Sequence, residues 1–266
     1  MKHIGLFLTL IVFAFWGTMN SLVILREREI ANLDKYRAGF RRFLGTDFLR
    51  ERWMSIYRKN RKIGYTGYRF EKVFALEGVE VHSSLESEVK IEVLGSEQWV
   101  EIEGNMVADE ELRPISLRLE VTVQDQPAAT LVGRREEDRL ALTLSAAGQK
   151  VALPSLSLEE LYLGDALVPT LPVAGLRIGE TFAVPCFDPV KLGRSVATVE
   201  VKAKETRDMD GLPVDAYCLE TTFRDVTSKS WVTEAGELMV QELGPPFQDI
   251  VLRRSNREEA QRINKR

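Results

Sequence analysis

A long stretch of strict alternation between apolar and polar residues constrains the fold of this chain more than any other feature. In Val79–Val93, the odd positions carry valine, leucine, isoleucine or serine, and the even positions carry glutamate, histidine, serine or lysine. A period of two places successive side chains on opposite faces of a β-strand, so one face is buried and the other is wet. The pattern recurs over Ile115–Val123 and over Leu140–Leu144, before a turn at Ala147–Gly148.

Further strand and turn signals extend this pattern toward the C-terminus. Strands are expected over Val196–Val201, Val214–Phe223 and Lys229–Thr233, with hairpin turns at residues 208–211 and 234–236. Long strands with one polar face each predict a mainly β protein, built on a large curved antiparallel sheet in the form of a half-barrel or an open barrel. The content of 44% hydrophobic residues is ample for the core of such a sheet.

The first 25 residues predict a membrane anchor. Ile4–Leu25 contains no charged side chain, and its 22 residues would span about 33 Å as a helix, close to the thickness of a bilayer core. A cleaved signal peptide, with Lys2 before the apolar run Ile4–Trp16, is one alternative and a soluble helix is another. Because residues 16–21 offer no good pair of small residues for cleavage and no lipoprotein cysteine, the prediction is an uncleaved single-pass membrane anchor.

Charge divides the rest of the chain into three blocks. Residues 26–62 hold 12 Lys and Arg against 5 Asp and Glu, residues 63–252 hold 17 against 33, and residues 253–266 hold 6 against 2. The first block is a basic collar beside the apolar span, which favours anionic lipid headgroups, although a solvated helix surface is the alternative. The acidic body argues against nucleic acid as a partner.

Two segments outside the sheet are predicted to be helical. Residues 26–50 carry a helical stripe that could pack on the β domain, lie in the membrane interface or pair with another copy. The stripe consists of Ile30, Leu33, Arg37, Phe40 and Leu44. Residues 256–265 are expected to form a short basic helix. The expected organisation is an anchor (1–25), a juxtamembrane helix (26–50), an antiparallel β domain (51–252) and a basic tail (253–266).

The middle of the chain departs from the strand pattern. Residues 153–192 are rich in leucine and proline, and we expect them to cover the open face of the sheet, or else to divide two β subdomains. Within them, Ser157–Glu160 has the pattern of a capping box for a helix that runs to Leu167.

Few side chains in this sequence suit catalysis or metal binding. His82 is the one histidine beyond the N-terminal segment, and strand parity places it on the wet face beside carboxylates, where a catalytic role is unusual. Cys186 and Cys218 could form a disulfide in an oxidising compartment, and two separate core thiols are the alternative. No Gly-rich phosphate loop, HExxH, CxxC or GxSxG motif occurs. The sequence therefore predicts no metal, no cofactor and no catalytic residue.

Three short motifs follow one another along the chain. The first is an opening hairpin, Trp53–Tyr57 and Lys62–Tyr68 around a turn at Lys59–Arg61, the second runs over Leu176–Pro189, and the third over Trp231–Leu238. Their marked positions are Trp53, Tyr57, Lys62, Gly64, Tyr65, Gly179, Pro185, Phe187, Asp188, Pro189, Trp231 and Gly236. In this order, the motifs resemble a β-rich domain of bacterial envelope proteins that often precedes a transglutaminase-like module.

The resemblance covers about residues 53–242 and implies an envelope location, with the anchor in the inner (cytoplasmic) membrane. We therefore expect the β domain to be extracytoplasmic, although the positive-inside rule, applied to the basic collar, would place it in the cytoplasm. Similar half-barrels occur in lipoprotein-carrier-like folds, which implies an apolar concave face. Because 24 residues follow position 242, we expect no transglutaminase-like module and none of its activity.

Three functions fit these observations. The missing catalytic groups favour a membrane-anchored, non-enzymatic extracytoplasmic domain that acts as a binding or assembly module in the bacterial envelope. The second is a carrier or sensor of a hydrophobic, lipid-like ligand in the concave face of the sheet. The third is a glycan-acting enzyme that uses carboxylates alone, which requires two acids about 5–10 Å apart in a cleft. The expected partners are membrane lipid, bound through the N-terminal helix and the basic collar, and an envelope protein or a hydrophobic ligand.

Overall fold

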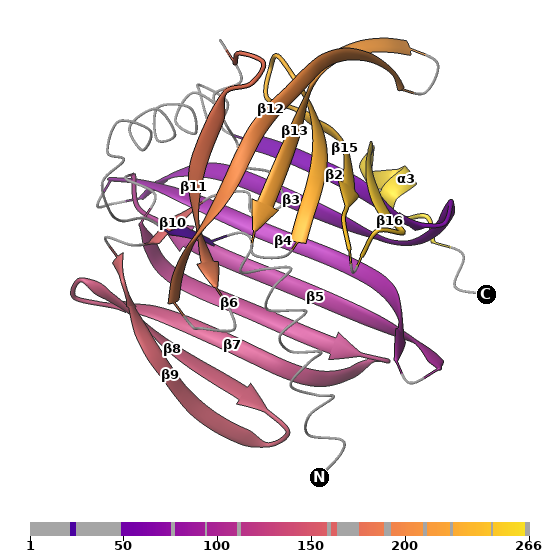
Figure 1. The fold of residues 1–266 in the computed structure, drawn as a ribbon. Coiled ribbons are helices and arrows are strands. Elements are labelled where there is room, and N and C mark those ends of the chain that lie inside the picture. Colours follow the sequence, from indigo (N-terminus) through magenta and orange to yellow (C-terminus); the bar gives the residue numbers. More distant parts are fainter. Residues whose placement is uncertain are drawn as a thin grey trace.

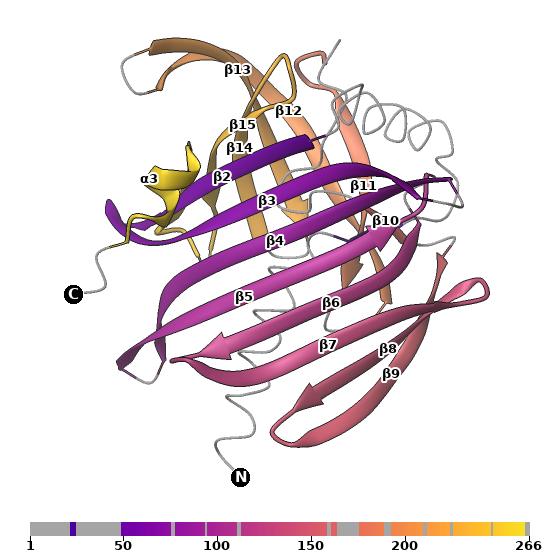
Figure 2. The same ribbon diagram turned by 180° about the vertical axis from the view of Figure 1, so that it is seen from behind.

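Strands make up most of the structure, and 14 of them form one antiparallel sheet (Figures 1 and 2). The computed structural model describes residues 22–24, 49–75, 78–93, 95–110, 113–158, 161–163, 176–188, 193–209, 212–223, 226–245 and 247–263. The first half of the sheet consists of β2 (Leu49–Arg58), β3 (Arg61–Ala75), β4 (Gly78–Val93), β5 (Ser96–Ala108), β6 (Pro114–Val123), β7 (Gln126–Glu136), β8 (Arg139–Ala146) and β9 (Gln149–Ser157). The second half consists of β11 (Thr181–Asp188), β12 (Gly193–Met209), β13 (Leu212–Phe223), β14 (Val226–Thr233), β15 (Leu238–Leu243) and β16 (Ile250–Ser255).

The sheet is a meander in which β16, the last strand of the chain, pairs with β2. The order is β11-β12-β13-β14-β15-β16-β2-β3-β4-β5-β6-β7-β8-β9, so every neighbouring pair except β16 and β2 is consecutive in sequence. At that junction Leu252 lies opposite Ile56. The edge strands are β9 and β11, and the sheet is not closed. A separate two-stranded sheet is formed by β1 (Leu22–Ile24) and β10 (Leu161–Leu163).

Tight turns fix the register of several hairpins. Two-residue turns join β2 to β3, β6 to β7 and β8 to β9, and both residues of each turn have positive φ. In the first of these turns, φ is 48° at Lys59 and 63° at Asn60. Turns of this kind match the right-handed twist of the flanking strands. The predicted turns at Lys59–Arg61 and Ala147–Gly148 are confirmed.

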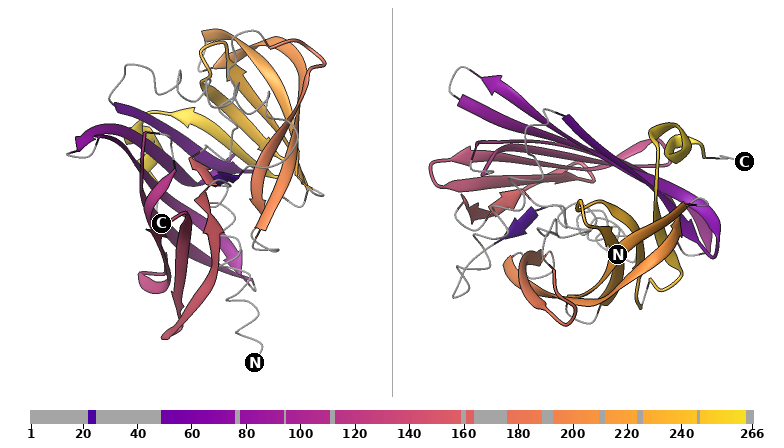
Figure 3. Two further views of the ribbon diagram at one scale, coloured as in Figure 1. Left: turned by 90° about the vertical axis from the view of Figure 1, so that its left-hand side faces the viewer. Right: turned by 90° about the horizontal axis from the view of Figure 1, so that it is seen from above.

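Two apolar clusters lie on one face of the sheet, which we call the inner face, in contrast to the outer face. The first cluster lies mainly on β3–β9 and includes Leu131 and Leu140. The second lies mainly on β2 and β12–β16 and includes Met54 and Val199. Val89 of β4 packs against both clusters, so the apolar surface is continuous. The view from above shows the second half curving round opposite the first (Figure 3).

The alternation in the sequence explains this division of faces. Val81, Leu85 and Val89 of β4 contribute to the first cluster on the inner face. His82 and Glu86, at the intervening positions, lie on the outer face. The prediction of a mainly β protein with one large antiparallel sheet is confirmed.

The leucine- and proline-rich middle of the chain differs from the prediction. Ser157 does not cap a helix but belongs to β9, where it pairs with Arg139 of β8. Leu161–Leu163 is also a strand rather than part of a helix. The ladder hydrogen bonds of these strands outweigh the local capping signal. Residues 153–192, expected to cover the sheet, contain the end of β9 and all of β11, which are its two edge strands.

The segments on either side of the sheet are described in part. Leu22–Ile24, at the end of the predicted anchor, is strand β1 instead of helix, because its backbone pairs with β10; residues 1–21 lie outside the described residues. Of the predicted juxtamembrane helix, only the last two residues are described, and they begin β2. In the described part of the chain, no helix has the length and apolar character needed to cross a membrane.

A C-terminal helix is present as α3 (Arg257–Gln261), but it is shorter than the predicted 256–265, because it ends at its C-cap, Arg262. It follows directly on β16, and Asn256 is its N-cap. The side chain of Asn256 accepts a hydrogen bond from the backbone N–H of Glu259, with Oδ1 and N 2.8 Å apart. This cap turns the chain away from the sheet and starts the helix.

Candidate functional site

The opening hairpin of β2 and β3 holds the C-terminal helix α3 on the outer face (Figure 2). The ring of Trp53 lies across Gly67, where an added Cβ would come within 2.4 Å of the ring. The ring of Tyr65 lies beside it, with the two centroids 6.0 Å apart. Ala260 of α3 packs against both rings and is fully buried. Trp53 and Tyr65, two residues of the first motif, therefore hold helix α3 against the sheet.

Polar contacts complete this docking. The hydroxyl of Tyr65 donates to Oε1 of Glu86 at 2.7 Å, and Nε2 of Gln261 donates to the same oxygen at 2.8 Å. Nζ of Lys62 donates to the backbone carbonyl of Glu259 in α3. Burial and the hydrogen bond to Glu86 raise the pKa of Tyr65 above its ordinary value, so the hydroxyl stays protonated as a donor. We call Trp53, Lys62, Tyr65 and Glu86 the aromatic seat.

The remaining motif positions do not gather at one place. Gly64 lies so close to β4 that an added Cβ would be 2.2 Å from the backbone oxygen of Glu88. Gly179 and Gly236 lie in turns with φ of 84° and 83°, which glycine adopts without strain. The guanidinium of Arg253 lies over the ring of Tyr57. Pro185, Phe187 and Asp188 are described only through the backbone of β11, and Pro189 lies outside the described residues.

Trp231, the aromatic residue of the third motif, lies on the outer face of the second half. Its side chain is only 3% exposed, because the guanidinium of Arg207 stacks on the ring with Cζ 3.6 Å from the centroid. Nε1 of Trp231 donates to Oε1 of Glu205 at 2.6 Å. Cys218 belongs to the same small buried cluster. Trp231 therefore packs the outer side of the second half of the sheet.

The two cysteines do not form the disulfide considered from the sequence. Cys186 lies opposite Ser195 of β12, whereas Cys218 lies opposite Ala203 of the same strand. These two β12 positions are separated by about 26 Å along the strand, at ~3.3 Å per residue, which is far beyond the reach of a disulfide. Cys218 is a free, buried thiol. Burial, together with the carboxylate of Glu205, raises its pKa and disfavours the reactive thiolate.

His82 lies on the outer face of β4, as its parity predicts. Its Nε2 is 2.8 Å from Oε2 of Glu80, and 42% of its side chain is exposed. Because Cys218 lies in the other half of the sheet, the two side chains best suited to nucleophilic chemistry are not brought together. Within the described residues, no group of three or more His, Cys, Asp or Glu side chains is arranged to hold a metal ion.

The register of the sheet brings together carboxylates that are far apart in the sequence. Glu86, Glu103 and Glu120 lie directly opposite one another on β4, β5 and β6. In a second row, Glu88 lies opposite Glu101. We call these five residues the acidic rows. Like charges in directly opposed positions destabilise a sheet. Glu120 forms an ion pair with Arg118 of its own strand, whereas no lysine or arginine of the described residues pairs with Glu101 or Glu103.

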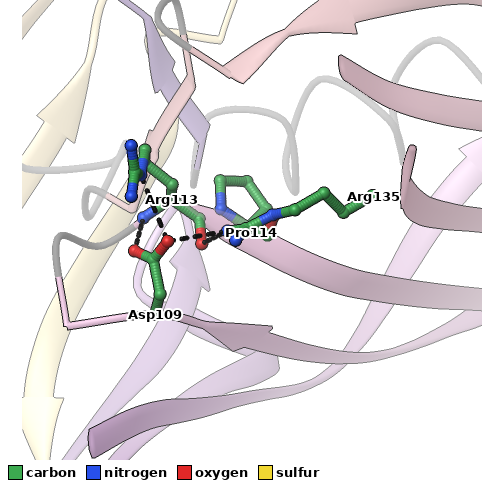
Figure 4. Close-up of polar contacts among 4 residues, drawn as sticks. All are labelled: Asp109, Arg113, Pro114 and Arg135. Atoms are coloured by element: carbon green, nitrogen blue, oxygen red, sulfur yellow. Dashed lines mark hydrogen bonds and ion pairs between the residues drawn. The ribbon is translucent and has the colours of Figure 1, made fainter. Parts of the chain in front are cut away.

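A charged cluster fixes the loop between β5 and β6 (Figure 4). The carboxylate of Asp109 accepts hydrogen bonds from the backbone N–H of Arg113 at 2.9 Å and from its Nε at 3.1 Å. Arg135 of β7 donates from Nη2 to the same carboxylate and from Nε to the carbonyl of Pro114, both at 2.9 Å. Partial burial alone would raise the pKa of Asp109, but these hydrogen bonds and the two guanidinium charges hold it below its ordinary value.

Asp109→Asn is expected to lower the free energy of unfolding at neutral pH by about 1.5 to 3 kcal/mol, the range for hydrogen bonds to charged groups. Because the pKa of Asp109 is lower in the folded protein, the stabilisation is present above the ordinary pKa of about 4 and is lost as the pH falls through the folded value. Urea unfolding at several pH values should therefore show that the difference in free energy of unfolding between the unaltered chain and Asp109→Asn becomes smaller below about pH 4. Asp125→Asn, in an exposed turn, is the control; a pH-independent difference for Asp109→Asn would contradict this role.

The inner face is not uniformly buried. Leu131 and Leu140, at its centre, are 2% and 0% exposed. Toward β8 and β9, Leu144 and Leu153 are only partly buried. Val151, which lies directly opposite Leu144, is 50% exposed. The apolar surface therefore continues from the core to the edge strand β9, where it is open to solvent.

Comparison with known proteins gives a structural likeness but no family. No protein-family model matches the chain, and no curated protein matches it. Among solved structures, the chain is similar to a beta-barrel-like protein of domain of unknown function DUF1849 from Brucella abortus, with 11% sequence identity and a TM-score of 0.44. The similarity covers 77% of this chain and 94% of that one. The resemblance of the three motifs to the transglutaminase-associated domain stays a prediction.

Proposed function

We propose that this protein is a membrane-tethered, non-enzymatic binding module of the bacterial envelope, and that its inner face binds a lipid-like ligand. The observation that carries the proposal is the apolar surface that reaches the β9 edge of the inner face. Leu144, Val151 and Leu153 continue the first apolar cluster to this edge. An aliphatic chain laid on these side chains would gain about 25 cal/mol for each Å² of apolar surface removed from water.

The sequence supports the same function by placing this surface beside a bilayer. Ile4–Ser21, which directly precedes strand β1, is uncharged, and its 18 residues would span about 27 Å as a helix, close to the thickness of a bilayer core. The basic collar that follows would hold the domain against anionic headgroups. An extracytoplasmic domain tethered in this way has acyl chains within reach of its inner face.

The positions of the reactive side chains support binding rather than catalysis. His82 contacts Glu80 in the first half of the sheet, while Cys218 is a buried thiol of raised pKa in the second half. Asp109 is held by two arginines. The acidic rows bring carboxylates close together, but they lie on the outer face of a sheet, whereas a glycosidase holds its acids on either side of the bound sugar.

Photocrosslinking tests the lipid-like ligand. The full chain is placed in nanodiscs that contain a photoreactive phosphatidylethanolamine, and the crosslinked peptides are identified by mass spectrometry. We expect adducts on residues 139–157. Val151→Asp places a charge on the inner face and is expected to lower their yield about five-fold or more.

Ala152→Asp is the matched control for Val151→Asp. Ala152 is the next residue of β9 and is also exposed, but it lies opposite Thr143 on the outer face. Its adduct yield should equal that of the unaltered chain. Adducts confined to the N-terminal segment, or equal losses in the two variants, would refute lipid binding at the inner face.

A further inference from the structure

Helix α3 is held by the aromatic seat rather than by its own length. It has five residues, and isolated helices this short are not stable in water. Ala260 is its one buried residue. Elements with so few buried contacts open locally far more often than the strands beneath them.

The contacts of α3 show which kind of segment the seat accepts. The guanidinium of Arg257 lies 5.1 Å from the ring centroid of Trp53. Ala260 packs against the two rings, and Gln261 donates to Glu86. Positions 257, 260 and 261 share one face of a helix by their i, i+3, i+4 spacing. The seat therefore selects a helix that carries a cation, a small residue and a hydrogen-bond donor on one face.

The acidic rows extend this surface beyond α3. Between its contact with Trp53 on β2 and its contact with Glu86 on β4, the helix crosses the strands in the direction of β5 and β6. Glu103 and Glu120 come next in the same row. Because neighbouring strands are ~4.8 Å apart and a helical turn rises ~5.4 Å, each further turn of a helix on this line would reach the next carboxylate.

We propose that the aromatic seat and the acidic rows together form a docking site for a short basic amphipathic helix of a partner protein. In the unbound protein, helix α3 of the same chain occupies this site. The partner helix reproduces the contacts of α3 and places a basic residue on Glu103, one turn further on, and a second beside Glu120, which already pairs with Arg118. The charge of Glu103, which no lysine or arginine of the described residues pairs, is then neutralised. Helix α3 acts as a latch that the partner displaces. The site lies on the outer face and does not depend on the ligand of the inner face.

A peptide in trans tests this site. The probe is a fluorescein-labelled peptide with the sequence of residues 253–266, and its anisotropy is measured with the full chain in detergent. Ala260→Glu in the protein places a carboxylate at the buried position against the rings of Trp53 and Tyr65 and expels α3. Because the competing latch is then absent, this variant should bind the peptide about ten-fold more tightly than the unaltered chain, or more.

Two further substitutions test the acidic rows. In the Ala260→Glu background, Glu103→Gln should weaken peptide binding about three-fold or more, because it removes one attractive charge. Glu137→Gln removes an exposed charge in the turn between β7 and β8 and should leave the affinity unchanged. Absence of binding to the folded Ala260→Glu chain, or equal effects of these two substitutions, would overturn the proposal.

Hydrogen exchange of the unaltered chain tests the latch without any variant. The backbone amides of α3 should exchange about 100-fold faster than those of β2 and β3, or more, because the latch opens while the sheet stays folded. If the amides of α3 exchange as slowly as those of β2 and β3, helix α3 does not leave the aromatic seat, and the proposal is overturned. A concentration-dependent dimer in sedimentation of the unaltered chain would assign the seat to a second copy instead of a partner protein, and would also overturn it.

Discussion

Replacing Gly64 with alanine is expected to lower the free energy of unfolding by about 2 to 3 kcal/mol. An added Cβ would lie 2.2 Å from the backbone oxygen of Glu88 and 2.7 Å from the Cα of Val89. Both are backbone atoms, so no rotamer change relieves the clash, and β3 must move away from β4. The separation occurs at Val89, where the two apolar clusters meet. Urea unfolding followed by tryptophan fluorescence measures the loss.

Gly104→Ala is the matched control for this substitution. Gly104 lies in β5, and an added Cβ would have ordinary contacts, the nearest at 3.4 Å from side-chain atoms of Leu119 and Leu85. Because alanine restricts the conformations of the unfolded chain, we expect the free energy of unfolding to stay the same or to rise by up to about 1 kcal/mol. Equal losses for the two substitutions would mean that the contact between Gly64 and β4 does not limit stability.

Local patterns are sufficient to predict the strands and their faces. The alternation over Val79–Val93 matches β4, which spans Gly78–Val93. The turn at Ala147–Gly148 has positive φ at both residues and joins β8 to β9. Both features depend on residues close together in the sequence, because side-chain direction and turn geometry are set by the neighbouring backbone. For that reason they are readable without any knowledge of the tertiary structure.

The order of the strands could not be predicted in this way. The pairing of β16 with β2 brings the hydroxyls of Ser55 and Ser255 to within 3.0 Å, although these residues are 200 positions apart. No local signal specifies a partner at that distance. The same limit explains the error at Ser157, whose capping signal is local while its pairing with Arg139 comes from the β8–β9 hairpin.

The candidate sites on the outer face show the same limit. Alternation places Glu86 on the wet face of its strand, but it does not align it with Glu103. Their alignment follows from the hairpin that pairs Val93 with Ser96, and counting back along both strands from this turn would have found it. The contact between α3 and Trp53 has no comparable signal, because tertiary packing alone joins the segment after β16 to β2, although these two strands are the last and the first of the 14-stranded sheet in sequence.

The two proposed functions use opposite faces of one sheet. The apolar inner face provides the core and, at β9, an accessible surface for an apolar ligand. The outer face carries the aromatic seat and the acidic rows, which share Glu86. A loss of lipid adducts in Val151→Asp should leave peptide binding to the seat unchanged, because the two surfaces lie on opposite sides of the sheet.

Trp231→Ala is expected to lower the free energy of unfolding by about 3 to 5 kcal/mol, the range for removing a buried tryptophan. The substitution removes the ring on which Arg207 stacks and the N–H that donates to Glu205. Trp231→Phe keeps a ring for stacking but loses the donor, and should cost about 1.5 kcal/mol. Urea unfolding of the two variants separates these contributions. The loss in free energy of unfolding for Trp231→Phe should be less than half of the loss for Trp231→Ala. Equal losses would show that the hydrogen bond to Glu205, rather than the stacked ring, holds the outer side of the second half together.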